Sequence, residues 1–200
     1  YTARLNRKSG LLESYAVGSV FKPVLAAAAL EKGVLPEYEC TGAIVVDGQI
    51  FRCAGGIAHG TVDLTGALEK SCNGYFIQLG QKLGTEKLLQ TAKQFGFGQE
   101  APVTGGLYAD AGNLPELDEL AQSGQLANFS FGQGNLLATP LQVAAMMNTI
   151  ASGGIYRTPF FAECTLDETD GTLLETLSHP QSRRVMTVEN AETLRRMLMQ

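Results

Sequence analysis

The segment from Ser19 to Lys32 limits the fold more than any other part of the chain. It is rich in alanine and leucine and is closed by Gly33, a pattern that predicts a buried helix with a glycine C-cap. Proline is tolerated only in the first turn of a helix, so Pro23 requires this helix to begin close to Ser19. The chain has 200 residues, 44% of them hydrophobic, which is enough to enclose such a helix in one domain or in most of a larger one.

The remaining segments predict a helix-rich α+β protein. Alternating residues around Asp47-Gly48 predict a hairpin over Gly42–Arg52. Thr139 is expected to cap a helix that runs to about Ser152. Further helices are predicted over Thr61–Lys70, Asn73–Leu83, Thr85–Phe95 (with Thr85 as N-cap) and Val188–Met199, and antiparallel strands over Ile155–Leu166 and Leu173–Leu177. The tract Gly98–Phe131 is predicted to be irregular, with one short helix near Leu117–Ala121.

Charge and hydropathy argue against two broad classes of protein. The net charge is -5 and the basic residues are scattered, which argues against a nucleic-acid partner. The longest apolar run, Val24–Leu30, is far shorter than the roughly 20 residues that span a bilayer. The chain opens without Met and stops inside a helical pattern, so we interpret it as a piece of a longer protein whose anchor lies elsewhere.

The four cysteines are Cys40, Cys53, Cys72 and Cys164. They form no C-x-x-C pair, which weakens a zinc interpretation. Cys40 and Cys53 flank the predicted hairpin, and a disulfide between them would add about 3 kcal/mol of stability by restricting the unfolded chain. Two reduced, partly buried thiols are the alternative.

Ser19-Val20-Phe21-Lys22 is an S-x-x-K motif at the start of the buried helix. Residues three apart share a helix face, so the Lys22 amine can reach the Ser19 hydroxyl. A serine hydroxyl is a poor nucleophile unless a neighbouring base takes its proton, and a lysine serves as that base when burial or positive potential lowers its pKa. The bare motif is common, and its ordinary interpretation is a helix start with a surface lysine.

The flanking residues narrow the interpretation. Tyr15 to Pro23 (YAVGSVFKP) closely resembles the P-G-S-x-F-K-P box of penicillin-binding proteins, with Val17 in place of the commoner proline, and Asn6-Arg7 matches the N-R that usually precedes it. Ser71-Cys72-Asn73 is similar to the S-x-N motif of the same family, although a simple helix N-cap is its interpretation without that context. Phe131 to Gly134, followed by Ala138 to Ala144, resembles the G-Q-G…T-P-L-Q-x-A segment of the transpeptidase members.

The resemblance covers roughly residues 4 to 200 and implies a penicillin-binding/β-lactamase-like transpeptidase fold, with residues 1–200 forming a partial domain. It implies a D,D-transpeptidase that crosslinks peptidoglycan stem peptides through an acyl-serine and is inhibited covalently by β-lactams. The implied catalytic residues are Ser19, Lys22, Ser71 and Asn73, and Ser19, Ser71 and Asn73 would also bind substrate. His59 is interpreted as structural, Gln133 is given no catalytic role, and neither a metal nor an organic cofactor is implied.

The resemblance also implies an extracytoplasmic location, a membrane anchor absent from this chain, and cell-wall synthesis machinery as a further partner. The family's third motif, K-[ST]-G, is absent, and Arg157-Thr158-Pro159 is no substitute because proline lacks the N–H group. In the family it follows a helix like Val188–Met199 and supplies one oxyanion-hole N–H. Losing one such donor slows acyl transfer by about 100- to 1000-fold, so this piece alone is predicted to have little or no activity.

Two alternatives to the transpeptidase remain. The first is a hydrolase, either a β-lactamase or a D,D-carboxypeptidase, which needs an activated deacylating water; in the β-lactamases most often met, a glutamate after the S-x-N motif holds that water. Glu100, Glu116 and Glu119 follow the S-x-N motif, but none stands in the E-x-x-x-N frame. The second is a non-enzymatic β-lactam sensor or scaffold domain that keeps the acylatable serine without turnover.

Overall fold

The structure, a computed structural model, describes residues 10–104, 107–160, 163–176 and 181–200. Within these residues the α-helices are α1 (Lys22–Lys32), α2 (Leu64–Glu69), α3 (Asn73–Leu83), α4 (Thr85–Gln94), α5 (Ser123–Ser130), α6 (Pro140–Ala151) and α7 (Val188–Met197). Short 3₁₀ turns are η1 (Gly18–Phe21), η2 (Ala54–Gly56) and η3 (Glu119–Ala121). In the part of the chain described, no helix is long and apolar enough to cross a membrane.

The strands pair in antiparallel twos rather than in one large sheet. The pairs are β1 (Tyr15–Ala16) with β8 (Leu137–Ala138), β2 (Tyr38–Cys40) with β5 (Gly60–Val62), β3 (Ala43–Val46) with β4 (Gln49–Arg52), β6 (Ala101–Thr104) with β7 (Leu107–Ala109), β9 (Ile155–Arg157) with β12 (Ser182–Arg184), and β10 (Cys164–Leu166) with β11 (Leu173–Thr176). Together with the helices they form the α+β architecture that the sequence predicts.

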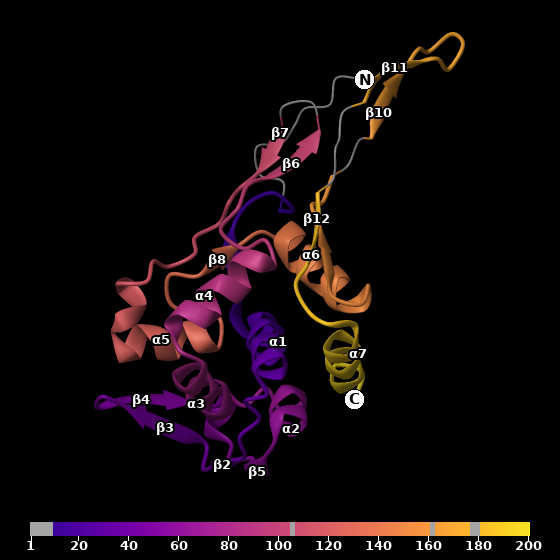
Figure 1. The fold of residues 1–200 in the computed structure, drawn as a ribbon. Coiled ribbons are helices and arrows are strands. Elements are labelled where there is room, and N and C mark those ends of the chain that lie inside the picture. Colours follow the sequence, from indigo (N-terminus) through magenta and orange to yellow (C-terminus); the bar gives the residue numbers. More distant parts are fainter. Residues whose placement is uncertain (1–9, 105–106, 161–162, 177–180) are drawn as a thin grey trace.

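Helix α1 lies at the centre of the molecule, in contact with α2, α3, α4 and α7 (Figure 1). Every side chain from Val24 to Ala29 is fully buried. The predicted start and end are confirmed, because η1 leads from Ser19 into α1 and Gly33 closes it in the left-handed conformation. The buried alanines let the neighbouring helices approach closely, so the N-terminal end of α1 is held rigidly.

Two other sequence predictions are confirmed in detail. The hairpin β3–β4 turns at Asp47-Gly48, with Val46 opposite Gln49. The Thr139 side chain accepts a hydrogen bond from the Gln142 N–H, and Gln142 Oε1 accepts from the Thr139 N–H, which forms a complete capping box. Local sequence signals were sufficient here because both features are closed by residues a few positions apart.

Several predicted boundaries are wrong because contacts from distant segments decide them. Residues Gly60–Val62 pair with β2, so the helix expected from Thr61 begins only after Asp63, whose carboxylate caps α2 through the Gly66 N–H. Thr85 lies inside α4 rather than capping it, and Gly84 takes the cap position. The expected strand over Ile155–Leu166 is two strands, β9 and β10, that pair with different partners; residues 161 and 162 lie outside the described part.

The tract Gly98–Phe131 is more regular than the sequence predicts. The short helix near Leu117–Ala121 is present as η3, but the hairpin β6–β7 and the helix α5 were missed. Helix α5 packs on α3, and its Ala127 and Phe129 are buried against the core. Tertiary packing therefore stabilises a segment whose own sequence, with Gly124 near its start, gives a weak helical signal.

Candidate active site

Ser19 lies on the 3₁₀ turn η1, immediately before α1, and it is exposed to solvent. The turn is anchored by Phe21, which is fully buried and packs its ring against Phe97 and Phe129, with ring centroids 5.3 and 5.1 Å away. Buried aromatic contacts of this kind allow little movement. The exposed hydroxyl is therefore carried by a rigid backbone.

Lys22 is almost completely buried at the first position of α1 and is surrounded by oxygen atoms. Its Nζ lies 3.0 Å from Ser19 Oγ and 2.7 Å from Ser71 Oγ. It also lies 2.8 Å from both the Ser71 carbonyl oxygen and Asn73 Oδ1. The structure thus brings together all four residues predicted for the site.

A neutral Lys22 amine can satisfy the hydrogen-bonding groups around it. The Ser71 carbonyl and Asn73 Oδ1 can only accept hydrogen bonds, and a neutral amine has two N–H groups to give them. Its single lone pair can then accept a hydrogen bond from one hydroxyl group at a time, that of Ser19 or that of Ser71. Because the Ser71 hydroxyl lies 2.9 Å from Ser19 Oγ, the three groups form a closed path for a proton.

Burial lowers the pKa of Lys22 to about 8, and the electrostatic influence of Cys53 and Cys72 acts in the opposite direction. The sequence analysis gives burial or positive potential as causes of a lowered lysine pKa, and burial is the largest cause here. A pKa near 8 leaves a useful fraction of neutral amine at physiological pH, which a proton acceptor requires.

Ser71 lies in the tight turn between α2 and α3, and Asn73 is the first residue of α3. Ser71 has a φ of 50°, a left-handed conformation that is unfavourable for serine, and Lys22 holds it by contacts to both its carbonyl and its hydroxyl. Asn73 Nδ2 donates to the Arg52 carbonyl at 2.8 Å, at the end of β4. The second N–H of the Asn73 amide remains for a ligand.

The G-Q-G segment packs directly against the nucleophile turn. The Gly18 N–H donates to the Gly132 carbonyl at 2.7 Å. Gly132 has a φ of 82°, and a Cβ atom there would collide with the Gly18 carbonyl oxygen. This close backbone approach agrees with a supporting role for the segment, and the Gln133 side chain is exposed.

A pocket of about 330 Å³ opens beside Ser19. Ser19, Lys22 and Ser71 lie on its polar side. The rest of its lining is apolar and comes from η1, α1, α2, α6 and the residue that follows α7: Val20, Pro23, Leu68, Val143, Met147 and Leu198. Sequence reasoning missed the apolar lining, although the i, i+4 spacing of Val143 and Met147 on the capped helix α6 was a usable signal.

The glutamates that the sequence offered for holding a deacylating water do not line this pocket. Glu119 is bound to the Asn135 side chain and the Glu116 N–H, and Glu100 is exposed. Of the described residues, no glutamate lines the pocket.

The Cys40 and Cys53 sulfur atoms lie 3.7 Å apart, well beyond the roughly 2.05 Å of a disulfide bond, so both are thiols in this structure.

The fold and the site are those of a class of proteins that transfer acyl groups through a serine. A serine nucleophile, a buried lysine and a second serine surround one pocket. Comparison with known proteins agrees. Residues 6–200 match the penicillin binding protein transpeptidase domain, and the chain belongs to this family.

This chain is similar, along most of its length, to several known proteins in sequence and in structure. It is 34% identical to the peptidoglycan D,D-transpeptidase PbpA of Mycolicibacterium smegmatis, over 95% of this chain and 39% of that protein. It is 31% identical to the stage V sporulation protein D of Bacillus subtilis, over 95% of this chain and 30% of the relative. The ceftriaxone acyl-enzyme complex of penicillin-binding protein A from M. tuberculosis has a TM-score of 0.84 at 29% identity, over 94% of this chain and 43% of that one. The chain thus spans less than half the length of these relatives.

Proposed function

We propose that the protein is a peptidoglycan D,D-transpeptidase that crosslinks stem peptides through an acyl-Ser19 intermediate and is acylated at the same residue by β-lactams. The observation that carries the proposal is the placement of Lys22 Nζ 3.0 Å from Ser19 Oγ and 2.7 Å from Ser71 Oγ, beside an open pocket. The family and the names of its relatives support the substrate class.

In the acylation step, Ser19 Oγ attacks the carbonyl carbon between two terminal D-alanines. Lys22 accepts the hydroxyl proton as the new C–O bond forms. The C–N bond then breaks, and the proton moves through the Ser71 hydroxyl to the departing D-alanine amine. The chain Ser19–Lys22–Ser71 provides both transfers without rearrangement, because all three groups are already within hydrogen-bond distance.

In the second step, an amine from a neighbouring stem peptide attacks the acyl-Ser19 carbonyl. The same groups act in reverse, with Lys22 and Ser71 taking the amine's proton and returning one to Ser19 Oγ. A β-lactam follows the first step but keeps its leaving nitrogen attached through the opened ring, so the acyl-enzyme persists. The Ser19 backbone N–H contributes one oxyanion donor, and a K-[ST]-G strand would contribute the other.

Asn73 is proposed to hold the substrate's peptide bond. Its Oδ1 and one N–H are occupied by Lys22 and the Arg52 carbonyl, which fix the amide plane, and its free N–H can donate to a substrate carbonyl. The apolar side of the pocket, with Val143 and Met147 on α6, would contact the aliphatic part of the ligand.

The hydrolytic alternative receives no support from the pocket. It needs an activated water beside the acyl group, and the glutamate that holds this water in common β-lactamases is not found among the described residues that line the pocket. A sensor or scaffold domain would share the acylation site, and it differs only in lacking turnover with stem peptides. The activity measurement below separates these two possibilities.

The site of action follows from the substrate. Peptidoglycan is crosslinked outside the cytoplasmic membrane, so we propose that the protein acts at the extracytoplasmic face and is held there by an anchor outside this chain. Its partners would be stem peptides, β-lactams and the proteins of cell-wall synthesis. The net charge of -5 supports the absence of a nucleic-acid partner from this list.

The test uses the full-length protein that contains this chain. After treatment with penicillin, intact-mass and peptide mass spectrometry should find one adduct, on Ser19. Lys22→Ala should slow acylation by orders of magnitude, whereas Lys32→Ala, at the exposed far end of the same helix, should leave the rate unchanged. An adduct on another residue, or equal acylation by the two lysine variants, would contradict the assignment.

Turnover distinguishes the three functions. A transpeptidase should join a donor stem peptide to an acceptor amine with release of D-alanine. Rapid hydrolysis of nitrocefin would indicate the hydrolase, and acylation without any release of D-alanine would indicate the sensor.

A further inference from the structure

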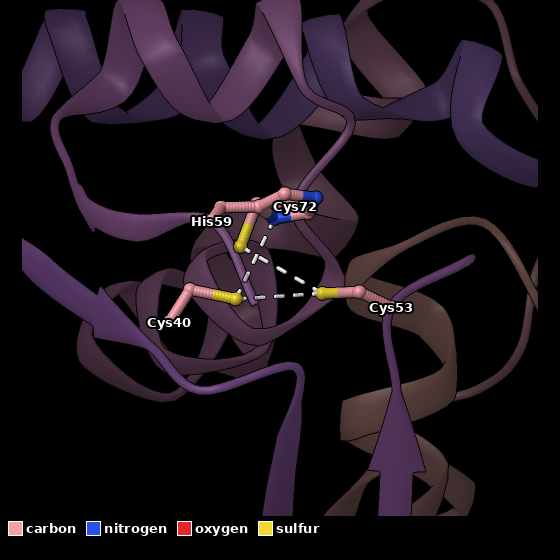
Figure 2. Close-up of side chains that lie close together, drawn as sticks. All are labelled: Cys40, Cys53, His59 and Cys72. Atoms are coloured by element: carbon pink, nitrogen blue, oxygen red, sulfur yellow. Dashed lines mark hydrogen bonds between the residues drawn. The ribbon is translucent and has the colours of Figure 1, made fainter. Parts of the chain in front are cut away.

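Three cysteines and a histidine converge a short distance from the active site (Figure 2). Cys40 ends β2, Cys53 follows β4, His59 precedes β5, and Cys72 lies between Ser71 and Asn73. Their sulfur atoms and a ring nitrogen all lie within 4.8 Å of one another. The three cysteines are almost fully buried, and His59 is half-buried.

Three of the six separations among the four ligand atoms match those around one tetrahedral ion, and all six are within 4.8 Å. With Zn–S bonds of about 2.3 Å and a Zn–N bond of about 2.05 Å, tetrahedral angles place two sulfurs about 3.8 Å apart and a sulfur and a nitrogen about 3.6 Å apart. The Sγ atoms of Cys40 and Cys53 lie 3.7 Å apart, and those of Cys53 and Cys72 lie 3.9 Å apart. Cys40 Sγ lies 3.5 Å from His59 Nδ1.

We propose that Cys40, Cys53, His59 and Cys72 bind one Zn²⁺ ion in a tetrahedral Cys₃His site. Thiolate and imidazole are the ligands that zinc prefers, and a sulfur-rich tetrahedral set disfavours magnesium and calcium. With four protein ligands no position is open for substrate, so the site is structural rather than catalytic. The absence of a C-x-x-C pair therefore does not exclude zinc, because the fold gathers the ligands from four segments.

The backbone around the cluster is built for close approach. The Cys53 N–H donates to the Gly42 carbonyl at 3.0 Å, and the His59 N–H donates to the Cys40 carbonyl at 3.1 Å. Gly42 has a φ of 91°, and a Cβ atom there would collide with the Gly56 carbonyl oxygen. These contacts hold two ligand-bearing loops against each other, as the outer contacts of a metal site commonly do.

The site would add a metal link between segments that already pack together around the start of α3. It would tie the ends of β2 and β4 to the turn that carries Ser71. That turn is strained at Ser71, and a metal bond to the next residue, Cys72, would help to hold it. Structural zinc contributes binding free energy directly to folding, which would suit a corner of the molecule made from short strands.

The test measures metal in the full-length protein, purified under reducing conditions without chelator. Elemental analysis by mass spectrometry should find about one zinc per chain. Cys40→Ser and Cys53→Ser should each lose most of it. Cys164→Ser is the matched control, because Cys164 lies on β10 outside the cluster, and it should retain the full amount.

A second measurement does not depend on how the variants fold. Wild-type protein stripped by a chelator should take up Co²⁺ in a 1:1 ratio, and its spectrum should show thiolate-to-cobalt charge transfer and tetrahedral d–d bands that added Zn²⁺ removes. Stripping should also lower the Tm, and zinc should restore it.

The proposal is overturned if purified protein contains no zinc and stripped protein fails to bind it. It is equally overturned by iron in place of zinc, by a disulfide among Cys40, Cys53 and Cys72 under reducing purification, or by equal zinc loss in Cys164→Ser. None of these outcomes depends on acylation of Ser19, so the metal site and the proposed function can fail independently.

Discussion

The pH dependence of Ser19 acylation tests whether Lys22 is the base. Only the neutral amine can accept the serine proton, and burial is the main cause that lowers its pKa to about 8. With that pKa, about 1% of Lys22 is neutral at pH 6 and about half at pH 8. The second-order acylation rate constant should therefore rise about 50-fold between pH 6 and pH 8, and level off above pH 9.

The assay is stopped-flow fluorescence with a labelled penicillin on the full-length protein, at constant ionic strength from pH 6 to pH 10. Lys32→Ala should give the same profile, and Lys22→Ala should lose the ascending limb. A rate constant that is flat from pH 6 to pH 9 would refute the assignment of Lys22 as base. A midpoint near the usual lysine pKa of about 10.4 would refute the claim that burial shifts it.

Three further predictions concern the residues that support the site. Thr139→Ala should remove the capping box of α6 and destabilise the protein by about 1 kcal/mol, seen as a lower Tm, whereas Thr139→Ser should be nearly neutral. Gln142→Glu removes the amide that donates to three backbone carbonyls, and urea unfolding should show a loss of at least about 2 kcal/mol. Gly132→Ala should slow acylation about 10- to 100-fold by displacing the Ser19 turn. Gly153→Ala is the control, because Gly153 has a similar φ but open space around it, and this variant should acylate at the normal rate. Equal acylation rates in the two variants would contradict the packing argument.

The sequence was most informative where structure is local. The Asp47-Gly48 hairpin and the Thr139 capping box are each closed by residues within one turn of each other. The buried helix after Ser19 is marked by its own alanine-rich run and by Gly33. All three were predicted. The S-x-x-K spacing also placed the Lys22 amine beside the Ser19 hydroxyl, because helix geometry fixes that distance.

The sequence was least informative where distant segments meet. Strand β5 consists of three residues whose pairing with β2 outweighs their helical pattern, and α5 is stabilised by packing on α3. The cluster of Cys40, Cys53, His59 and Cys72 was missed for the same reason. No pair of these residues has a short ligand spacing, and only the tertiary fold brings the four together.

At Ser71, the effect of the backbone conformation on protein stability can be measured separately from the effect of the hydroxyl group on acylation. A non-glycine residue in the left-handed region is less stable by about 1–2 kcal/mol, and glycine escapes this penalty. Ser71 adopts a φ of 50° while its hydroxyl lies between Lys22 and Ser19. Strain of this kind is typically retained where a side chain has a chemical task.

Replacing Ser71 by alanine or by glycine removes the same hydroxyl but not the same strain. Both variants should lose most acylation, because the proton path from Lys22 to the leaving group is cut. Ser71→Gly should nevertheless unfold at a higher urea concentration than Ser71→Ala, by the equivalent of about 1 kcal/mol, because glycine accepts the left-handed conformation. Acylation of Ser71→Ala at the wild-type rate would show that the hydroxyl carries no proton, and equal stability of the two variants would show that the turn is unstrained.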